Sequence, residues 1–315
     1  MSLWRSPLLL LLAFAGVPQS DLLADSVYWT DKEDFRIRRG DMDGSNPPVV
    51  LLGPADGLGI PQGIGLDVAG GKMYWADSQY DHIRRANLDG TGIETLIDTG
   101  MTFPADLELD LGNGKIYWTD TSQGEIRRAD LNGDNVQVLY TGLTSPYYFE
   151  LDTAGGRIYW AENYNTVVHV SQMDGSGHIE TLNVGAARIR DLALDPANDK
   201  LYWGDRESHT IHLANLDGTG GQILFDVADG LDRPHGMAID IPAGMLYWTD
   251  TRMYSINRGR MDGTGSVDVL YTGLVSPWDI ELDVEEIPEP STAALVVAGL
   301  VAMAIVGRRK RRNTE

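Results

Sequence analysis

The sequence predicts an all-β fold, a six-bladed β-propeller, and three features of the chain support this prediction. The first is a Tyr-Trp word, complete as Tyr28-Trp29-Thr30-Asp31, whose six copies begin 42 to 46 residues apart. That spacing is typical of repeats in which one unit is one four-stranded blade. The others are a Pro-led segment and an Asp-Gly or Asn-Gly turn that recur with the word. The copies begin at Tyr28, Tyr74, Tyr117, Tyr159, Tyr202 and Tyr247.

The second feature predicts the innermost strand of each blade and the way in which the ring closes. Five segments that end in Leu-Asp or Ile-Asp precede a word, and a sixth, at 277–283, follows the last word. Since the first word has no such segment before it, we expect 277–283 to pair with the N-terminal strands and to leave no open sheet edge. The five lie at 61–67, 104–110, 146–152, 189–195 and 234–240.

The third feature predicts a hairpin turn late in each repeat. In the second repeat, alternation predicts strands at 63–67, 72–76, 83–87 and 93–97, and Asp89-Gly90 joins the last two. Such dipeptides accept positive φ, so the turns need no metal to explain their acidic residues. The segment 130–134 lacks the full spacing of an EF-hand loop. The turns are Asp43-Gly44, Asp89-Gly90, Asn132-Gly133, Asp174-Gly175, Asp217-Gly218 and Asp262-Gly263.

Composition excludes several kinds of site. The chain has no Cys, so disulfides, thiolate metal sites and Cys nucleophiles are excluded. Its formal net charge of −21 predicts repulsion of nucleic acid and of anionic lipid, and favours cations or basic partners. The alternative is that the charge serves solubility alone. We expect a monomer.

The two ends of the chain differ from the repeats between them. Residues 1–24 carry Arg5, an apolar run at 8–17 and the small residue Ala24, which predicts a secretory signal peptide. Residues 285–315 carry Pro288-Glu289-Pro290, an apolar run at 293–306 and a basic cluster that begins with Arg308 and Arg309. A short apolar helix followed by basic residues is typical of a stop-transfer segment. The propeller is expected at 25–284.

The C-terminal pattern of Pro-Glu-Pro, a short apolar helix and terminal Arg residues resembles the PEP-CTERM sorting signal of Gram-negative bacteria. This resemblance implies recognition by an exosortase-type enzyme and a transient anchor in the inner membrane through the C-terminal helix. It also implies delivery to the outer surface or the extracellular matrix, where biofilm matrix is one expected location. Pro288, Glu289, Pro290, Arg308 and Arg309 are the expected signal residues.

The repeats at about 25–284 resemble the YWTD, or class B, repeats of the low-density lipoprotein receptor family. The resemblance implies a six-bladed propeller in which the Trp of each word packs between blades and its Asp accepts hydrogen bonds. A family Arg is present in four blades but is replaced by Val170 and Leu213 in the fourth and fifth, and Glu162 replaces the Asp of the fourth word. We expect the polar contacts to be weakest there. The family's flanking Cys-rich modules are missing, so receptor-style ligand binding does not carry over. The four Arg residues are Arg39, Arg85, Arg128 and Arg258.

The loops that join the second strand to the third and the fourth to the next blade are expected on one face, at the mouth of the channel. This face is the expected binding surface, for a glycan or a protein ligand, and the alternative is that its aromatic side chains plug the channel. Starts of the innermost strands contribute Gln62, Ala105, Tyr147, Tyr148, Arg190, His235 and Trp278. The loops contribute Phe35, Tyr80, Tyr164, His209 and Tyr254.

Six carboxylates are expected on the innermost strands near the axis, where alternation would place both sets on one side of their strands. Carboxylates this close repel one another unless a cation such as Ca²⁺ bridges them or basic side chains pair with them. Pairing with Arg190 and His235 without an ion is the favoured alternative. The carboxylates are Asp106, Asp191, Asp279, Glu108, Glu150 and Glu281.

Catalytic motifs are lacking in the sequence: there is no Gly-x-Ser-x-Gly elbow, no His-Glu-x-x-His and no phosphate-binding loop. A non-catalytic binding module that requires no cofactor is therefore the main expectation. The alternative is a metal-dependent hydrolase, similar to the six-bladed lactonases, that uses the acidic channel. Such an enzyme would need an open channel with a metal and a base beside it.

Overall fold

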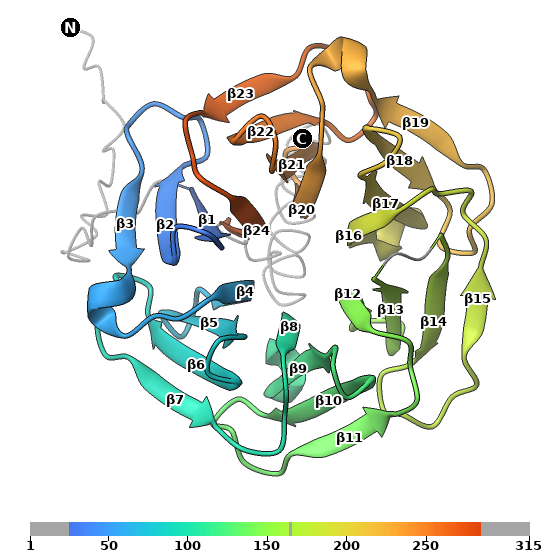
Figure 1. Ribbon diagram of the computed structural model, residues 1–315. Helices are drawn as coiled ribbons and strands as arrows, with labels where there is room; N and C mark the ends of the chain where they lie inside the picture. The colour runs from blue at the N-terminus through green and yellow to red at the C-terminus, as the bar shows by residue number, and fades with distance from the viewer. Residues whose placement is uncertain (1–24, 164–165, 285–315) are drawn as a thin grey trace, which may run out of the picture. The chain divides into compact units, whose positions relative to one another are not determined.

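The computed structural model describes residues 25–163 and 166–284, and each strand in these ranges belongs to one of six four-stranded antiparallel sheets. The sheets stand as blades around a central axis (Figure 1). The chain divides into two units, Met1–Asp283 and Val284–Glu315, and the propeller lies in the first. The expectations for 1–24 and 285–315 lie outside the described residues.

The first three blades follow the order of the chain. Blade 1 consists of β24 (Pro277–Asp283), β1 (Ser26–Asp31), β2 (Arg36–Asp41) and β3 (Val49–Leu52). Blade 2 consists of β4 (Pro61–Asp67), β5 (Lys72–Asp77), β6 (His82–Asn87) and β7 (Glu94–Ile97). Blade 3 consists of β8 (Pro104–Asp110), β9 (Lys115–Asp120), β10 (Glu125–Asp130) and β11 (Gln137–Tyr140).

The last three blades repeat the pattern. Blade 4 consists of β12 (Pro146–Asp152), β13 (Arg157–Glu162), β14 (Val168–Gln172) and β15 (Glu180–Leu182). Blade 5 consists of β16 (Ile189–Asp195), β17 (Lys200–Asp205), β18 (Thr210–Ala214) and β19 (Gln222–Phe225). Blade 6 consists of β20 (Pro234–Asp240), β21 (Met245–Asp250), β22 (Ser255–Arg260) and β23 (Asp268–Tyr271). Short 3₁₀ helices occur at Pro54–Asp56, Leu111–Asn113, Pro196–Asn198 and Val227–Asp229.

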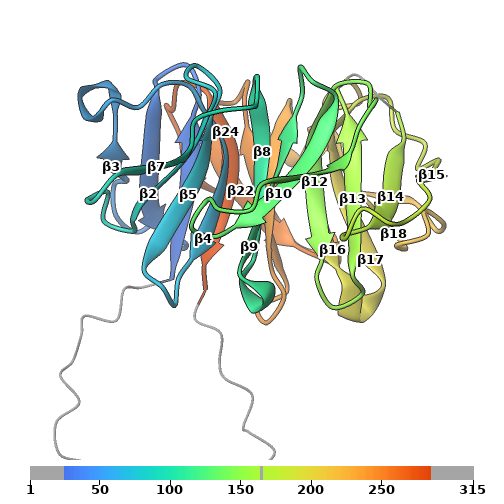
Figure 2. The ribbon, with the colours of Figure 1, turned by 90° about the horizontal axis from the view of Figure 1, so that it is seen from below.

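The closure of the ring confirms the prediction made from the surplus Pro-led segment. β24 pairs antiparallel with β1, with Ser26 opposite Asp283 and Val27 opposite Leu282. The innermost strands of all six blades surround the axis, and β3, β7, β11, β15, β19 and β23 lie outermost (Figures 1 and 2). Because the C-terminal strand completes an N-terminal sheet, neither end of the ring is left as an unpaired innermost edge.

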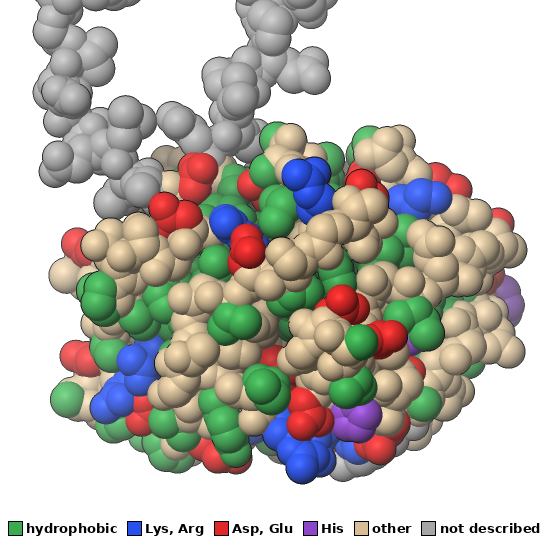
Figure 3. Space-filling model, turned by 90° about the horizontal axis from the view of Figure 1, so that it is seen from above, with side chains coloured by type: hydrophobic (Ala, Val, Ile, Leu, Met, Phe, Trp, Pro, Cys, Tyr) green, Lys and Arg blue, Asp and Glu red, His purple; other side chains and the backbone are tan. Residues whose placement is uncertain are grey.

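Side chains on the outermost strands are largely exposed, as in Val269 and Ile223, each with 57% of its surface accessible. Seen from the side, acidic, basic and apolar side chains are interspersed (Figure 3). The negative net charge is therefore spread among other side chains on this side of the molecule rather than collected in one patch.

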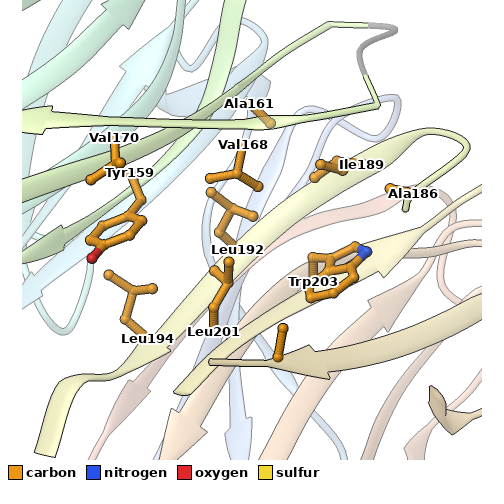
Figure 4. Packing of buried hydrophobic residues seen from close by; sticks show 11 residues of the cluster. Tyr159, Ala161, Val168, Val170, Ala186, Ile189, Leu192, Leu194, Leu201 and Trp203 are labelled. Carbon is orange, nitrogen blue, oxygen red and sulfur yellow. The ribbon is translucent and has the colours of Figure 1, made fainter. Parts of the chain in front are cut away.

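The Trp of each word lies between two blades, as the resemblance implies. In one cluster, Tyr159 and Val168 of blade 4 pack against Leu192 and Trp203 of blade 5 (Figure 4). All six Trp side chains are fully buried. Their indole N–H groups, however, have no hydrogen-bond partner in the described part of the chain, so these rings contribute by burial and stacking.

The carboxylate of each word fixes the loop that enters its own blade. Asp205, for example, accepts backbone N–H groups from Ala187 at 2.6 Å and from Arg188 at 3.2 Å. In blade 4, Glu162 takes the same role, accepting from the N–H of Thr144 at 2.9 Å. The longer Glu side chain thus still reaches the loop that leads into the innermost strand.

Candidate functional site

The mouth of the channel is closed by side chains from the second and third positions of the innermost strands. Tyr147, Arg190 and His235 are 5%, 4% and 1% exposed, and Gln62 is fully buried. A cavity of only about 10 Å³ lies among these side chains, lined by residues that include Tyr147, Tyr148 and His235. These packed side chains form a plug at the mouth, and Tyr147, Arg190 and Trp278 also line a hollow outside it. A role of the mouth residues in recognition stays a prediction.

Aromatic packing builds one half of the plug. The rings of Tyr147 and Tyr148 lie 4.6 Å apart, and Phe103 lies 6.3 Å from Tyr147. The hydroxyl of Tyr147 donates to the side-chain oxygen of Gln62 at 2.9 Å. Two strands on different blades are thus joined across the axis.

A chain of hydrogen bonds builds the other half. Arg190 Nη1 donates to the hydroxyl oxygen of Tyr148 at 3.0 Å, and that hydroxyl lies 3.0 Å from His235 Nε2. Since Arg190 donates to Tyr148, the hydroxyl proton is free for His235, and His235 Nδ1 lies 3.1 Å from the carbonyl oxygen of Trp278. Burial, together with the charges of Arg190 and Lys32, holds the pKa of His235 well below its usual value, so this ring is neutral.

The three axial Asp side chains connect neighbouring blades through backbone groups. Asp106 Oδ2 accepts from the N–H of Phe149 at 2.9 Å, and Asp191 Oδ2 accepts from the N–H of Met237 at 2.6 Å. Asp279 Oδ2 accepts from the N–H of Ile64 at 2.7 Å. Each link joins one innermost strand to that of the next blade, so these carboxylates hold the inner ring together.

The expectation that Arg190 and His235 pair with the axial carboxylates was wrong. Both side chains bond to Tyr148 instead, and Arg190 Nη1 also donates to Asn163 Oδ1 at 3.1 Å. A β-bulge explains part of the error, because the pairing of the innermost strand shifts register between Pro104 and Leu107. Such a bulge shifts the alternation of side chains counted from the Pro position. Asp106 therefore points toward the backbone of the neighbouring blade.

Burial and mutual repulsion raise the pKa values of the axial acids. Burial raises the pKa of Asp106 to about 7 and that of Glu281 to about 8. Burial, followed by the charges of Glu150 and Glu281, raises the pKa of Glu108 well above its usual value. Protonation near neutral pH therefore relieves part of the repulsion at the axis.

No group of three or more His, Asp or Glu side chains in the described ranges is arranged to hold a metal ion. The three Asp side chains already accept backbone N–H groups, which leaves each with fewer free oxygen lone pairs for a cation. The expectation of bound Ca²⁺ stays a prediction.

A basic hollow of about 390 Å³ lies outside the plug. Four of its lining residues are cationic and none is acidic, although the chain as a whole is strongly acidic. We call these ten residues the basic hollow. They are Lys32, Arg188, Arg190, Arg206, Asn163, Thr121, Ser122, Phe103, Tyr147 and Trp278.

The positive charges of the basic hollow lie close enough together to affect one another. Lys32 Nζ lies 3.8 Å from the centre of the Trp278 ring. Burial, followed by repulsion from Arg190, lowers the pKa of Lys32 to about 8. Arg188 pairs with Glu207 at 3.1 Å. The hollow is therefore a site of positive potential on an acidic protein.

Exposed aromatic side chains lie in the loops between the second and third strands. Phe35, Tyr80 and Tyr254 are 37%, 46% and 48% exposed. The N–H of Leu274, in the loop that leads to β24, donates to the carbonyl oxygen of Tyr254 at 3.1 Å. The two kinds of loop therefore lie on one face, as expected. Tyr164 lies outside the described residues.

Sequence reasoning identified Arg190 but missed Lys32, Arg188 and Arg206. Lys32 and Arg206 each directly follow the last residue of a Tyr-Trp word, and this position begins the loop on the mouth face. Comparing that position among the six repeats would have found both. The expectation of cations or basic partners rested on net charge, which does not report a local cluster of charge such as the basic hollow. That expectation stays a prediction.

Comparison with known proteins agrees with the repeats and the tail. The low-density lipoprotein receptor repeat class B model matches residues 114–143 and 199–241, and the PEP-CTERM protein-sorting motif matches residues 286–312. Among curated proteins, none matches the chain.

The fold is similar to that of a chain in the crystal structure of a nidogen/laminin complex. The TM-score is 0.73 with 21% sequence identity, over 84% of this chain and 100% of the other. Within the described ranges, no helix is long and apolar enough to cross a membrane. The apolar run at 293–306 lies outside those ranges. The chain is thus a six-bladed β-propeller that carries low-density lipoprotein receptor class B repeats, matched at residues 114–143 and 199–241, and a C-terminal PEP-CTERM protein-sorting motif.

Proposed function

We propose that this chain is exported, sorted by an exosortase-type enzyme to the surface or extracellular matrix of a Gram-negative bacterium, and acts there as a non-catalytic binding module. The PEP-CTERM motif, which implies sorting to the cell surface, supports the location. The mouth face is the binding surface. The observation that carries this proposal is the combination on one face of a plugged channel, a hollow of about 390 Å³ and exposed loop aromatics.

The plug also weighs against the alternative of a channel hydrolase. A substrate that enters from the mouth would have to displace Tyr147 and Tyr148, which are 5% and 4% exposed. The axial Asp side chains below the plug already accept backbone N–H groups. A binding module needs only the outer face, which is concave and solvent-accessible.

The binding step is tested by retention of the full-length chain at the surface of its own host. We expect Tyr80→Ala combined with Tyr254→Ala to release the protein into the medium, because both side chains are exposed on the mouth face. The control combines Val269→Ala with Ile223→Ala, which removes exposed apolar surface from the outermost strands. Equal retention of both double variants would contradict a binding role for the mouth face.

The sorting step is tested separately through the tail. Arg308→Gln combined with Arg309→Gln should leave the protein undelivered in the cell envelope, since the basic cluster belongs to the matched motif. Cell fractionation and immunoblotting measure the distribution. Normal delivery of this variant would contradict a role for the basic cluster in sorting.

A further inference from the structure

Three of the four cations of the basic hollow lack a carboxylate partner among the residues that the structure describes. In the described residues, Lys32, Arg190 and Arg206 form no ion pair with a carboxylate, whereas Arg188 is paired with Glu207. Burial, followed by the charges of Arg190, Arg233 and Arg188, lowers the pKa of Arg206. Clustering like charges is unfavourable, so the arrangement is relieved when an anion binds.

Arg190 is the anchor of the cluster. Its side chain is 4% exposed, and it is held in place by Tyr148 and Asn163. Its Nε atom is buried without a hydrogen-bond partner in the described residues. A buried guanidinium with no carboxylate partner is costly, and an anionic ligand in the hollow would provide the missing charge.

The remaining lining residues indicate what carries the negative charge. Thr121, Ser122 and Asn163 supply hydroxyl and amide groups, which suit a ligand with several hydroxyls of its own. Phe103 and Trp278 supply partly buried aromatic rings. The volume of about 390 Å³ falls within the range of small-molecule sites and exceeds what an isolated carboxylate fills.

We propose that the basic hollow binds a sugar acid, a hydroxylated ring that bears one carboxylate, with Arg190 and Arg206 on the carboxylate and the neutral polar residues on the hydroxyls. This inference rests on the proposed binding role of the mouth face and names a ligand class for it. An acidic side chain of a protein would satisfy the cations but carries no hydroxyl groups for Thr121, Ser122 and Asn163 to bind.

The test is calorimetric titration of the full-length chain with D-glucuronate and, as the uncharged match, D-glucose. We expect glucuronate to bind at least about tenfold more tightly, because a carboxylate–guanidinium contact is a strong charge-assisted hydrogen bond. Binding should weaken as NaCl is raised from about 0.05 M to 0.3 M. Equal affinities for the two sugars would overturn the proposal.

Variants separate the hollow from the rest of the protein. Arg206→Gln should weaken glucuronate binding about tenfold, and Arg206→Lys should weaken it less. Arg260→Gln is the matched control, since Arg260 is exposed and does not line the hollow. Glucuronate binding that is the same in Arg206→Gln and in the original chain would overturn the proposal, provided that the melting temperature is unchanged.

A third titration distinguishes the ligand class from the binding role. If N-acetyl-glutamate amide binds as tightly as glucuronate and depends equally on Arg206, the hollow takes isolated carboxylates and the sugar-acid assignment is wrong. If no carboxylate binds while the Tyr80 and Tyr254 variant still loses retention, the sugar-acid assignment fails and the proposed function stands. If retention is also unaffected, both fail.

Discussion

At the scale of single residues, the inner ring depends on alternating side chains at one position of the innermost strands. Asp occupies this position in three blades, and it accepts a backbone N–H from the blade that follows. Gly63 and Gly236 occupy it in two of the others, where they face the backbone of Asp106 and Asp279. The Asp in blades 1 and 3 thus follows a blade with Gly at this position, whereas Asp191 in blade 5 follows Tyr148 of blade 4.

The first prediction concerns the Asp link. Asp279→Ala should lower the free energy of unfolding by about 1–3 kcal/mol, because it leaves the N–H of Ile64 without its partner. Denaturant titration measures the change. Asp98→Ala, at an exposed position with no such link, should stay within about 0.5 kcal/mol. Equal effects of the two substitutions would show that the Asp link adds no stability.

The second prediction concerns the close approach at Gly63. A Cβ added there would lie 2.5 Å from the backbone nitrogen of Leu107 and 2.7 Å from the Cα of Asp106. Gly63→Ala should therefore destabilise the protein by about 1–3 kcal/mol through overpacking. Gly221→Ala is the control, since nothing lies within 4 Å of its added Cβ. A change at Gly63 no larger than that at Gly221 contradicts the packing described for this junction.

At the scale of strands, β24 (residues 277–283) is the element on which the ring depends most. It pairs with β1, and the loop before it donates the N–H of Ser276 to Asp31 at 2.9 Å. Thr249, in the last word, also donates to the carbonyl oxygen of Trp278 at 2.8 Å. One strand therefore contacts both the first and the last blades.

The third prediction is that truncation before β24 abolishes cooperative unfolding. A chain that ends at residue 276 leaves the edge of β1 unpaired and should aggregate or lose its sharp thermal transition. A chain that ends at residue 284 retains β24 and serves as the control. Circular dichroism melting and light scattering compare the two. A sharp transition in the shorter chain would mean that β24 is dispensable for the ring.

The residue at the family Arg position contacts the next blade in different ways around the ring. Arg85 Nη1 donates to the carbonyl oxygen of Leu131 at 3.3 Å, and Arg258 Nη1 donates to that of Met42 at 2.9 Å. Val170 and Leu213 replace this Arg and are buried, with 2% and 7% exposed. Apolar packing therefore takes the place of the polar contact that the sequence comparison found missing in blades 4 and 5.

At the scale of the whole molecule, charge is distributed unevenly. The net charge is −21, yet the hollow at the mouth is basic and the axis holds acids whose pKa values are raised. The plug, which includes Tyr147, Tyr148 and His235, separates the basic hollow from the acidic axis. Because the axial acids bind protons more tightly in the folded state, stability must depend on pH.

The fourth prediction follows from the sign of that dependence. The folded-state pKa values of Asp106, about 7, and Glu281, about 8, lie above their unfolded values, so the folded state binds more protons and stability falls as pH rises. The depressed pKa of His235 acts in the opposite direction only below about pH 6.5, and Lys32 only above about pH 8. The melting temperature should therefore decrease between about pH 6.5 and pH 8.

A substitution isolates the axial contribution to this pH dependence. Glu281→Gln removes one titrating acid and should reduce the decrease in melting temperature over the same range. Glu94→Gln is the matched control, because Glu94 lies on the exposed β7 (residues 94–97) and pairs with Arg85 at the surface. A pH dependence that is identical in Glu281→Gln and in the original chain would remove the axial acids as its cause.

The sequence by itself determined the fold, the number of blades, the innermost strands and the closure by residues 277–283. These properties follow from repeat spacing, alternation and turn residues, which are local and recur six times. Arg190 and the aromatic residues were also found at the mouth by position alone.

Only the tertiary structure decided what those residues do. The plug depends on contacts such as Tyr147 with Gln62, whose positions differ by 85 residues in the chain. The β-bulges turned Asp106 toward a neighbouring backbone, which alternation could not show. The basic hollow brings Lys32, next to a strand of blade 1, together with Arg188 and Arg206, next to strands of blade 5. A local sequence pattern determines where each strand begins and ends. Which side chains contact one another is determined only when the ring closes, because the blades bring residues that are distant in the sequence to the same axis.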